Sequence, residues 1–227
     1  MSKGEASLAK LGRLTRIAIM VYILAAIANL AVTVLSFAWL GSLLRAAPGD
    51  HEMIGIMVIG VISSVISLIS LISIPASVIL VALWVNCAWS NLHEARLEGL
   101  NYTPGWATAS FFIPFVNMVV PMRALRELHN RSHGESDWHA AISVGDVTSW
   151  YACLWAAFLV GIALTVFLAL DSIPNLYVIL PTPGWILLGI LLAAFLLGSA
   201  WFLYRIIGKV TAAQSAMLHY AQAETFT

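Results

Sequence analysis

Apolar residues in this chain form long uninterrupted runs rather than the short amphipathic periods of a soluble fold. Five stretches contain no Asp, Glu, Lys or Arg, and each has 24 residues or more: 17–44, 53–93, 99–122, 147–170 and 172–204. The hydrocarbon core of a bilayer is about 30 Å thick, so a crossing helix needs about 20 mostly apolar residues. The pattern therefore predicts membrane-spanning helices.

Three of the runs predict one span each. The runs 17–44 and 147–170 contain no proline and are typical of single helices. The run 172–204 carries three prolines near its start, so we expect its helix to begin at Pro183, with Thr182 as its N-cap.

The run 53–93 is long for one span, because a helix of 41 residues extends about 60 Å. A hairpin of two helices is the alternative. Between Val61 and Val85, however, Pro75 is the only helix breaker. A tight turn in lipid would also leave backbone groups without hydrogen-bond partners. We therefore predict one long helix that ends near Glu94.

The run 99–122 has the length of a span but contains too many helix breakers. Thr103 and Pro104 are typical of a helix start, Pro114 stops that helix, and Pro121 opens another. Two short helices at the membrane interface, or a shallow re-entrant hairpin, fit this pattern better than a crossing.

The predicted fold is an all-α integral membrane protein with one membrane domain over residues 1–227. Four spans cover about 17–44, 54–90, 149–170 and 183–204, and an interfacial segment covers 94–146. With both termini and that segment in the cytoplasm, ten of the eleven basic residues lie inside and only Arg45 lies outside. The positive-inside rule favours this orientation.

Composition narrows the class of protein further. Apolar residues make up 61% of the chain and charged residues 10%, against about 45–50% and about 25% in soluble domains. With these fractions, a formal net charge of zero and two cysteines, the composition excludes a folded soluble domain, a secreted disulfide scaffold, a disordered tail and a basic nucleic-acid-binding module. Cys87 and Cys153 lie near the predicted cytoplasmic ends of their helices, where a disulfide is not expected.

Small hydroxyl residues mark one face of the second predicted span. They recur at intervals of three and four residues: Ser63, Ser67, Ser70, Ser73 and Ser77. This spacing places them within an arc of about 120°, where they favour close helix packing. The alternative is a polar lining for a solute path. No ionisable group lies in the middle of a span, which disfavours a proton or ion pump.

Histidines are concentrated on the predicted cytoplasmic side. His129 and His133, with Glu127, Asp137 and His139 nearby, are residue types that bind divalent metals. Gly134 indicates a solvated loop, however, so we expect surface histidines, no metal and no cofactor. No catalytic motif occurs, which predicts that the chain is not an enzyme. Asp146 is expected to cap the helix that begins at Val147.

The stretch 121–131 predicts an amphipathic helix. Its apolar positions are Met122, Leu125 and Leu128, and its polar positions are Arg123, Arg126, Glu127 and Arg131. Such a helix lies on the inner leaflet with its arginines near anionic headgroups, or packs against the protein's own spans. The sequence leaves both alternatives open.

Four motifs resemble a bacterial membrane family, the domain-of-unknown-function family numbered 4328. They are Trp89-Ser90-Asn91-Leu92, Pro104-Gly105-Trp106-Ala107, Phe112-Ile113-Pro114-Phe115-x-Asn117 and Pro121-x-x-Ala124-x-x-Glu127-Leu128. With the flanking spans included, the likeness covers roughly residues 54–198. The resemblance implies a bacterial inner-membrane location and no particular reaction.

We expect function to reside in the interfacial segment, as a docking surface for a protein partner or lipid. Its residues are Trp106, Phe112, Pro114, Asn117, Arg123 and Glu127. Asn117 is expected to satisfy backbone groups at the helix break, while Arg123 and Glu127 face the cytosol. The favoured function is helix association, as an accessory subunit or a homo-oligomer. The alternatives are a small transporter or channel for an uncharged or lipid-like solute, and a membrane enzyme that uses the histidines.

Overall fold

The computed structural model describes residues 3–43, 50–136, 139–173 and 182–224, and these residues form helices and connecting turns with no strand. Four helices are long: α1 (Lys3–Leu43), α2 (Asp50–Glu94), α5 (Gly145–Asp171) and α6 (Thr182–Glu224). Between α2 and α5 lie three short ones: α3 (Pro104–Ala109), the 3-10 helix η1 (Val116–Met118) and α4 (Val120–Ser132).

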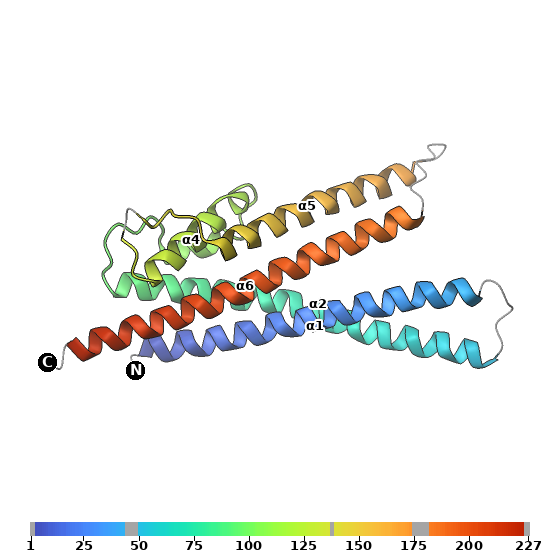
Figure 1. The fold of residues 1–227 in the computed structure, drawn as a ribbon, viewed down its shortest axis with the longest axis horizontal. Helices are drawn as coiled ribbons and strands as arrows, with labels where there is room; N and C mark the ends of the chain where they lie inside the picture. Colours follow the sequence, from blue (N-terminus) through green and yellow to red (C-terminus); the bar gives the residue numbers. More distant parts are fainter. Residues whose placement is uncertain (1–2, 44–49, 137–138, 174–181, 225–227) are drawn as a thin grey trace.

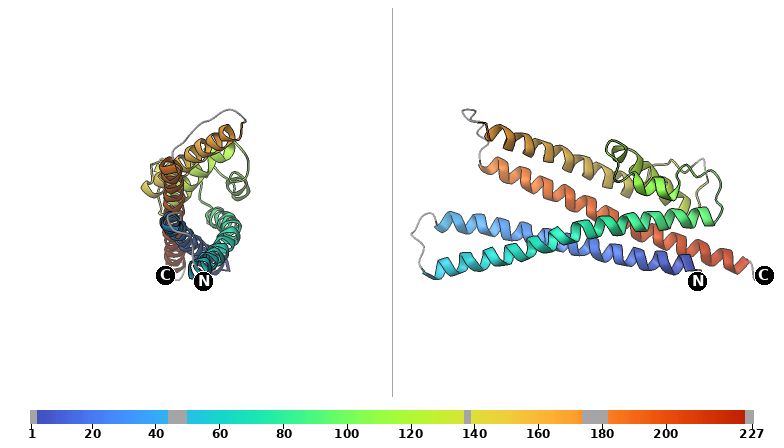
Figure 2. Two further views of the ribbon diagram at one scale, coloured as in Figure 1. Left: turned by 90° about the vertical axis from the view of Figure 1, so that its right-hand side faces the viewer. Right: turned by 180° about the vertical axis from the view of Figure 1, so that it is seen from behind.

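The long helices form two antiparallel hairpins, α1 with α2 and α5 with α6 (Figure 1, Figure 2). The main junction between the hairpins is the contact of α1 with α6. Both ends of the chain lie at one end of the bundle, together with α4, and we call this the terminal end (Figure 1). Toward the opposite end the two hairpins diverge.

The terminal end holds most of the buried core. Large apolar side chains buried there come from four helices: Leu8, Trp84, Trp89, Leu125, Leu128, Ile206, Ile207 and Val210. Farther along the bundle, large apolar side chains such as Leu24, Val61 and Leu168 stay exposed. All four long helices are long and apolar enough to cross a membrane. Since a bilayer solvates such a surface, these helices are the four predicted spans.

The helices extend past the predicted spans. α1 begins at Lys3 rather than near residue 17, and α6 continues to Glu224 rather than ending near residue 204. With 45 residues, α2 reaches about 68 Å, about twice the thickness of the bilayer core. Leu8 and Val210 are buried within these extensions, so packing between helices keeps them helical where the apolar runs end.

Proline positions account for the helix boundaries. α2 continues through Pro75, so the prediction of one helix is confirmed and the hairpin alternative is wrong. The Oγ1 of Thr103 accepts the backbone N–H of Trp106 at 3.3 Å, which confirms the predicted start of α3. α4 begins with Pro121 in its first turn, also as predicted. α6 begins at Thr182, whose capping side chain lies outside the described residues.

Candidate functional site

The connecting segment, residues 95–144, is held against the spans by α4. Ala124, Leu125 and Leu128 on the apolar face of α4 are almost completely buried. α4 contacts α2, α5 and α6, and its contact with α6 is the most extensive of these three. Of the two alternatives for this helix, packing against the protein's own spans is therefore the one observed.

Part of the polar face of α4 is buried as well. Glu127 is only 4% exposed, and its carboxylate accepts the backbone N–H of Asn101 at 2.8 Å and the side-chain amide of Asn101 at 3.2 Å. The prediction that Glu127 faces the cytosol is therefore wrong. A buried carboxylate needs hydrogen-bond donors, and Asn101 supplies both of these. Glu127 thus anchors the loop that leads into α3.

Two neighbours of Glu127 hold the other loops. The buried side-chain amide of Asn130 donates to the carbonyl oxygens of Ala140 at 3.0 Å and Ile142 at 2.9 Å. The guanidinium of Arg131 donates to the carbonyl oxygens of Glu98 and Glu135. Sequence analysis missed these anchoring roles, because the same residue types are common on solvated helix faces. The turns on both sides of α4 are thereby tied to it.

Gln214 on α6 joins three helices at a single side chain. Its Oε1 accepts from the amide of Asn91 at 3.2 Å, and its Nε2 donates to Ser132 Oγ at 2.9 Å and to the carbonyl of Ala88 at 3.1 Å. The side chain is 2% exposed. It links α2, α4 and α6 at the terminal end, and no motif in the sequence marked it.

A buried acid joins α5 to α6. Asp146 lies 2.7 Å from Lys209 Nζ and 3.4 Å from Arg205 Nη2, and its side chain is largely buried. The N-cap of α5 is Val144, and Asp146 lies in the first turn of the helix. The prediction that Asp146 caps α5 is therefore wrong, although an acid in the first turn also suits the positive end of the helix dipole.

The predicted docking residues of the connecting segment separate into two groups. Trp106, Phe112, Pro114 and Asn117 are exposed around the turns that join α3 to η1. Phe115 in the same turns has a φ of 64° and is 84% exposed. Arg123 is exposed on α4 and, with Glu127, lines a separate hollow of about 300 Å³.

Asn117 does not have the predicted role at the helix break. Among the described residues its side chain makes no hydrogen bond, while its backbone N–H donates to the carbonyl of Ile113 at 2.9 Å. The hydroxyl of Tyr151 on α5 donates to the carbonyl oxygen of Met118. Backbone turns and Tyr151 therefore satisfy these backbone groups.

A cavity of about 400 Å³ lies beneath the exposed turns, between the two hairpins. All four long helices contribute to its lining, and Phe112 and Asn117 line it on the side of the connecting segment. Ser77 and Ser199 are hydroxyl residues in this lining. The Oγ of Ser77 is buried without a hydrogen-bond partner. The structure thus brings one predicted packing serine and two predicted docking residues to the same cavity.

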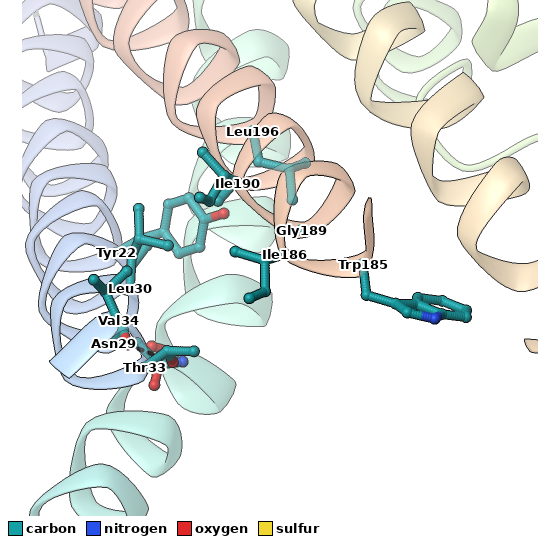
Figure 3. A pocket seen from close by; sticks show the side chains of 13 residues that line it. Tyr22, Asn29, Leu30, Thr33, Val34, Trp185, Ile186, Gly189, Ile190 and Leu196 are labelled. Carbon is teal, nitrogen blue, oxygen red and sulfur yellow. Dashed lines mark hydrogen bonds between the residues drawn. The ribbon is translucent and has the colours of Figure 1, made fainter. Parts of the chain in front are cut away.

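A larger cleft of about 630 Å³ separates α1 from α6 where the hairpins diverge. Tyr22 and Leu30 of α1 project toward Ile186 and Ile190 of α6, and Asn29, the residue before Leu30, belongs to the same lining (Figure 3). Asn29 is half-buried, and its side-chain amide has no hydrogen-bond partner among the described residues.

Small residues form part of the α6 wall of this cleft. Gly189 and Ala193 lie one turn apart in the lining. A Cβ atom added to Gly189 would meet nothing within 4 Å. The wall is therefore open enough to admit a closely approaching helix or chain.

The five predicted packing serines lie in different surroundings. Ser73 is buried, Ser63, Ser70 and Ser77 are half-buried, and Ser67 is exposed. Ser70 donates within α2 to the carbonyl of Ile66 at 3.1 Å and also lines the cleft. The serine face thus borders the space between the hairpins at Ser70 and Ser77. Packing and solute lining both stay predictions for it.

The three histidines considered as metal ligands lie in α4 or after it. The rings of His129 and His133 stack with centroids 4.2 Å apart, and Nδ1 of His139 lies 3.0 Å from Ser136 Oγ. In the described parts of the chain no three His, Cys, Asp or Glu groups are placed to hold a metal ion, and Asp137 lies outside those parts. His129 belongs to a helix and is half-buried, so the predicted solvated loop begins only after it.

We expect stability to fall in mild acid because of His129. Burial lowers the pKa of His129 below its ordinary value of 6.5, and the nearby His133 lowers it further. The unfolded chain therefore takes up a proton that the folded state resists, and the free energy of unfolding should decrease as the pH drops below about 6.5. Thermal unfolding in detergent from about pH 7.5 to about pH 5.5 measures this.

The variant His129→Phe keeps an aromatic ring beside His133 but cannot titrate. It should lose much of the pH dependence, whereas His139→Phe, at an exposed position, should retain it. Equal pH dependence in His129→Phe and the unaltered protein would contradict this assignment.

Together these features define a multi-pass α-helical membrane protein with a folded connecting segment between its second and third spans. The chain belongs to the family described as Domain of unknown function (DUF4328), which matches residues 57–212. The match covers the second, third and fourth spans and the whole connecting segment. Comparisons with curated proteins and with solved structures found no match.

Proposed function

We propose that this chain is a non-enzymatic protein of the bacterial inner membrane that acts by helix association, with a second copy of itself in the α1–α6 cleft. Both termini and the connecting segment face the cytoplasm in this proposal. Its support is the distribution of basic residues. Ten of the eleven lie in the first part of α1, in the connecting segment or in the second half of α6, all of which belong to the terminal end.

The observation that carries the proposal is the amide of Asn29. It lies in a span, lines the cleft and has no partner among the described residues. An unsatisfied amide in hydrocarbon is costly, and Asn side chains in membranes hydrogen-bond across helices. An amide is both donor and acceptor, so two Asn29 side chains related by a two-fold axis can satisfy each other.

The α6 wall supports the same occupant. Gly189 and Ala193 give the small-xxx-small spacing that lets helices approach closely in membranes. The apolar residues around them, such as Leu30 and Ile190, suit a helix surface better than water. A subunit of a different protein is the other occupant that these features allow.

The test substitutes a glycine of the cleft that has empty space beside it in a single copy of the chain. Because a Cβ atom at Gly189 meets nothing within 4 Å and points into the open cleft, we expect Gly189→Leu to fold normally and yet fill the cleft. We expect it to weaken self-association by about tenfold or more in reconstituted vesicles, measured by single-molecule photobleaching. Gly60→Leu on α2, which also meets nothing within 4 Å and lies outside the cleft, should associate normally.

Asn29→Leu provides a second variant of the same site. Loss of one hydrogen bond between transmembrane helices, worth about 0.6–2 kcal/mol, should weaken association by about threefold to thirtyfold. A protein that is monomeric before any substitution, or a Gly189→Leu variant that associates as well as Gly60→Leu, would refute self-association through the cleft. A different subunit that co-purifies and is lost only in Gly189→Leu would replace the second copy as occupant.

A lipid-like solute path is the second candidate function. The observation that favours it is that Tyr22 and Leu196 line both the α1–α6 cleft and the cavity of about 400 Å³ beneath the exposed turns, so the two spaces adjoin. Transport predicts faster redistribution of a fluorescent lipid between the leaflets of vesicles that contain the protein. Leu196→Trp should slow this redistribution while self-association is retained.

A further inference from the structure

A second groove lies between α1 and α6, at the terminal end rather than in the diverging half. It has a volume of about 480 Å³. Arg13 and Arg16 of α1 line one wall, and Tyr204, Gly208 and Thr211 of α6 line the other. No carboxylate is among its lining residues, so the two guanidinium charges are not neutralised within the groove.

Arg16 is positioned by Tyr204. Its Nη2 donates to the Tyr204 hydroxyl at 2.6 Å, and its Cζ lies 4.3 Å from the centroid of that ring. The Nε of Arg16 is buried and has no hydrogen-bond partner. A buried guanidinium N–H without an acceptor is costly, and an anion bound in the groove would supply one.

Two hydroxyl groups add further donors to the same groove. The Tyr204 oxygen accepts from Arg16, so its own proton remains available. Thr211 Oγ1 accepts from the indole Nε1 of Trp84 at 3.0 Å and donates no hydrogen bond among the described residues. Arginine and hydroxyl donors converging on one space are the donor set that phosphate oxygens prefer.

The position along the helices is that of lipid headgroups. Arg16 immediately precedes the uncharged run 17–44, and Tyr204 ends the uncharged run 172–204. The groove therefore lies where the apolar part of both helices stops. Ile17 and Met20, one turn deeper on α1, complete its lining with apolar surface.

We propose that this groove binds the phosphate group of an anionic membrane lipid, with the guanidinium groups of Arg13 and Arg16 on the phosphate and the lipid chains along Ile17 and Met20. Basic pockets between membrane helices bind anionic headgroups in this way. The site is independent of the α1–α6 cleft and of self-association.

The other arginine-lined hollow serves as a contrast. Arg123 and Arg126 line the hollow beside α4 together with the carboxylate of Glu127, which offsets their charge. On α6, Lys209 and Arg205 are paired with Asp146. Among the described residues, the lining of the Arg13–Arg16 groove is thus basic and contains no acid.

The experiment is native mass spectrometry of the full-length protein in detergent, titrated with dioleoyl phosphatidylglycerol and, separately, with dioleoyl phosphatidylcholine. We expect phosphatidylglycerol to be retained about tenfold more strongly. Either Arg13→Gln or Arg16→Gln should reduce that retention by about fivefold, and the double variant by about thirtyfold. Lys10→Gln removes one positive charge from an exposed position of the same helix outside the groove, and it should change retention by less than about twofold.

Tyr204→Phe keeps an aromatic ring under Arg16 and removes only the hydroxyl. It should lower phosphatidylglycerol retention by about threefold to fivefold at an unchanged unfolding temperature. Equal retention of the two lipids, or full retention in a folded Arg13→Gln/Arg16→Gln variant, would overturn the site. Displacement of the bound lipid by inorganic phosphate at the same concentration would overturn the lipid assignment in favour of a soluble phosphate compound.

Discussion

Replacing Gln214 by leucine should lower the free energy of unfolding by about 3–5 kcal/mol. The substitution removes the partner of Asn91, Ser132 and the Ala88 carbonyl at once, and these groups lie where water cannot replace it. Each polar group left buried without a partner costs about 1–3 kcal/mol. Because α2, α4 and α6 meet at this side chain, the connecting segment should also become sensitive to protease.

The neighbouring Ser215→Ala serves as the control. Its hydroxyl donates only to the carbonyl of Thr211 in its own helix, so stability should change by less than about 1 kcal/mol. The double variant Asn91→Leu/Gln214→Leu should be less destabilised than the sum of the two single variants, because it removes both partners of one bond. Unfolding in graded denaturing detergent compares these variants. A Gln214→Leu variant as stable as Ser215→Ala would show that the three-helix link contributes little.

Gly12→Ala should cost about 2–3 kcal/mol, although it adds a single methyl group. A Cβ atom at Gly12 would lie 2.7 Å from Thr211 Oγ1 and 3.2 Å from Thr211 Cγ2. Rotating Thr211 does not relieve the contact, because its hydroxyl accepts from Trp84 and its methyl group is close as well. We therefore expect α1 to move away from α6 and thermal unfolding in detergent to occur at a lower temperature.

Gly208→Ala gives a matched comparison across the same helix contact. Its Cβ would meet Arg16 only at 3.5 Å, an ordinary contact, and alanine favours helix, so stability should be unchanged or slightly higher. In a Gly12→Ala/Thr211→Ala protein the clash is removed while the bond to Trp84 is lost. That double variant should therefore be less destabilised than the sum of its parts. Equal unfolding temperatures for Gly12→Ala and Gly208→Ala would contradict the close approach of α1 and α6.

The spans could be predicted from sequence because the bilayer imposes one simple requirement on them. A run without charges that is longer than the hydrocarbon thickness has few alternatives to crossing as a helix. Pro104 and Pro121 likewise had local consequences that need no knowledge of the rest of the fold. Both proved to lie in the first turn of a short helix.

The polar contacts of the connecting segment could not be predicted in the same way. The polar side chains of Glu127 and Asn130 can form their hydrogen bonds with water or with protein. Only the path of the loops decides which of the two partners they have. Their partners are a loop asparagine and the carbonyls of Ala140 and Ile142, in stretches without periodic pattern. The helical ends beyond the bilayer, including Gln214, could not be predicted either. They depend on contacts between segments that are distant in the sequence.

The link between Gln214 and Ser132 also sets an order of events during synthesis. Gln214 leaves the ribosome 82 residues after Ser132, a delay of about 4–16 s at about 5–20 residues per second. Through that interval α1 and α2 can already pair with each other, while α4 has no α6 to rest on. The indole of Trp84 on α2 donates to Thr211 on α6 and lacks this partner until α6 arrives, so a chaperone or membrane protease has these seconds in which to act on the nascent chain.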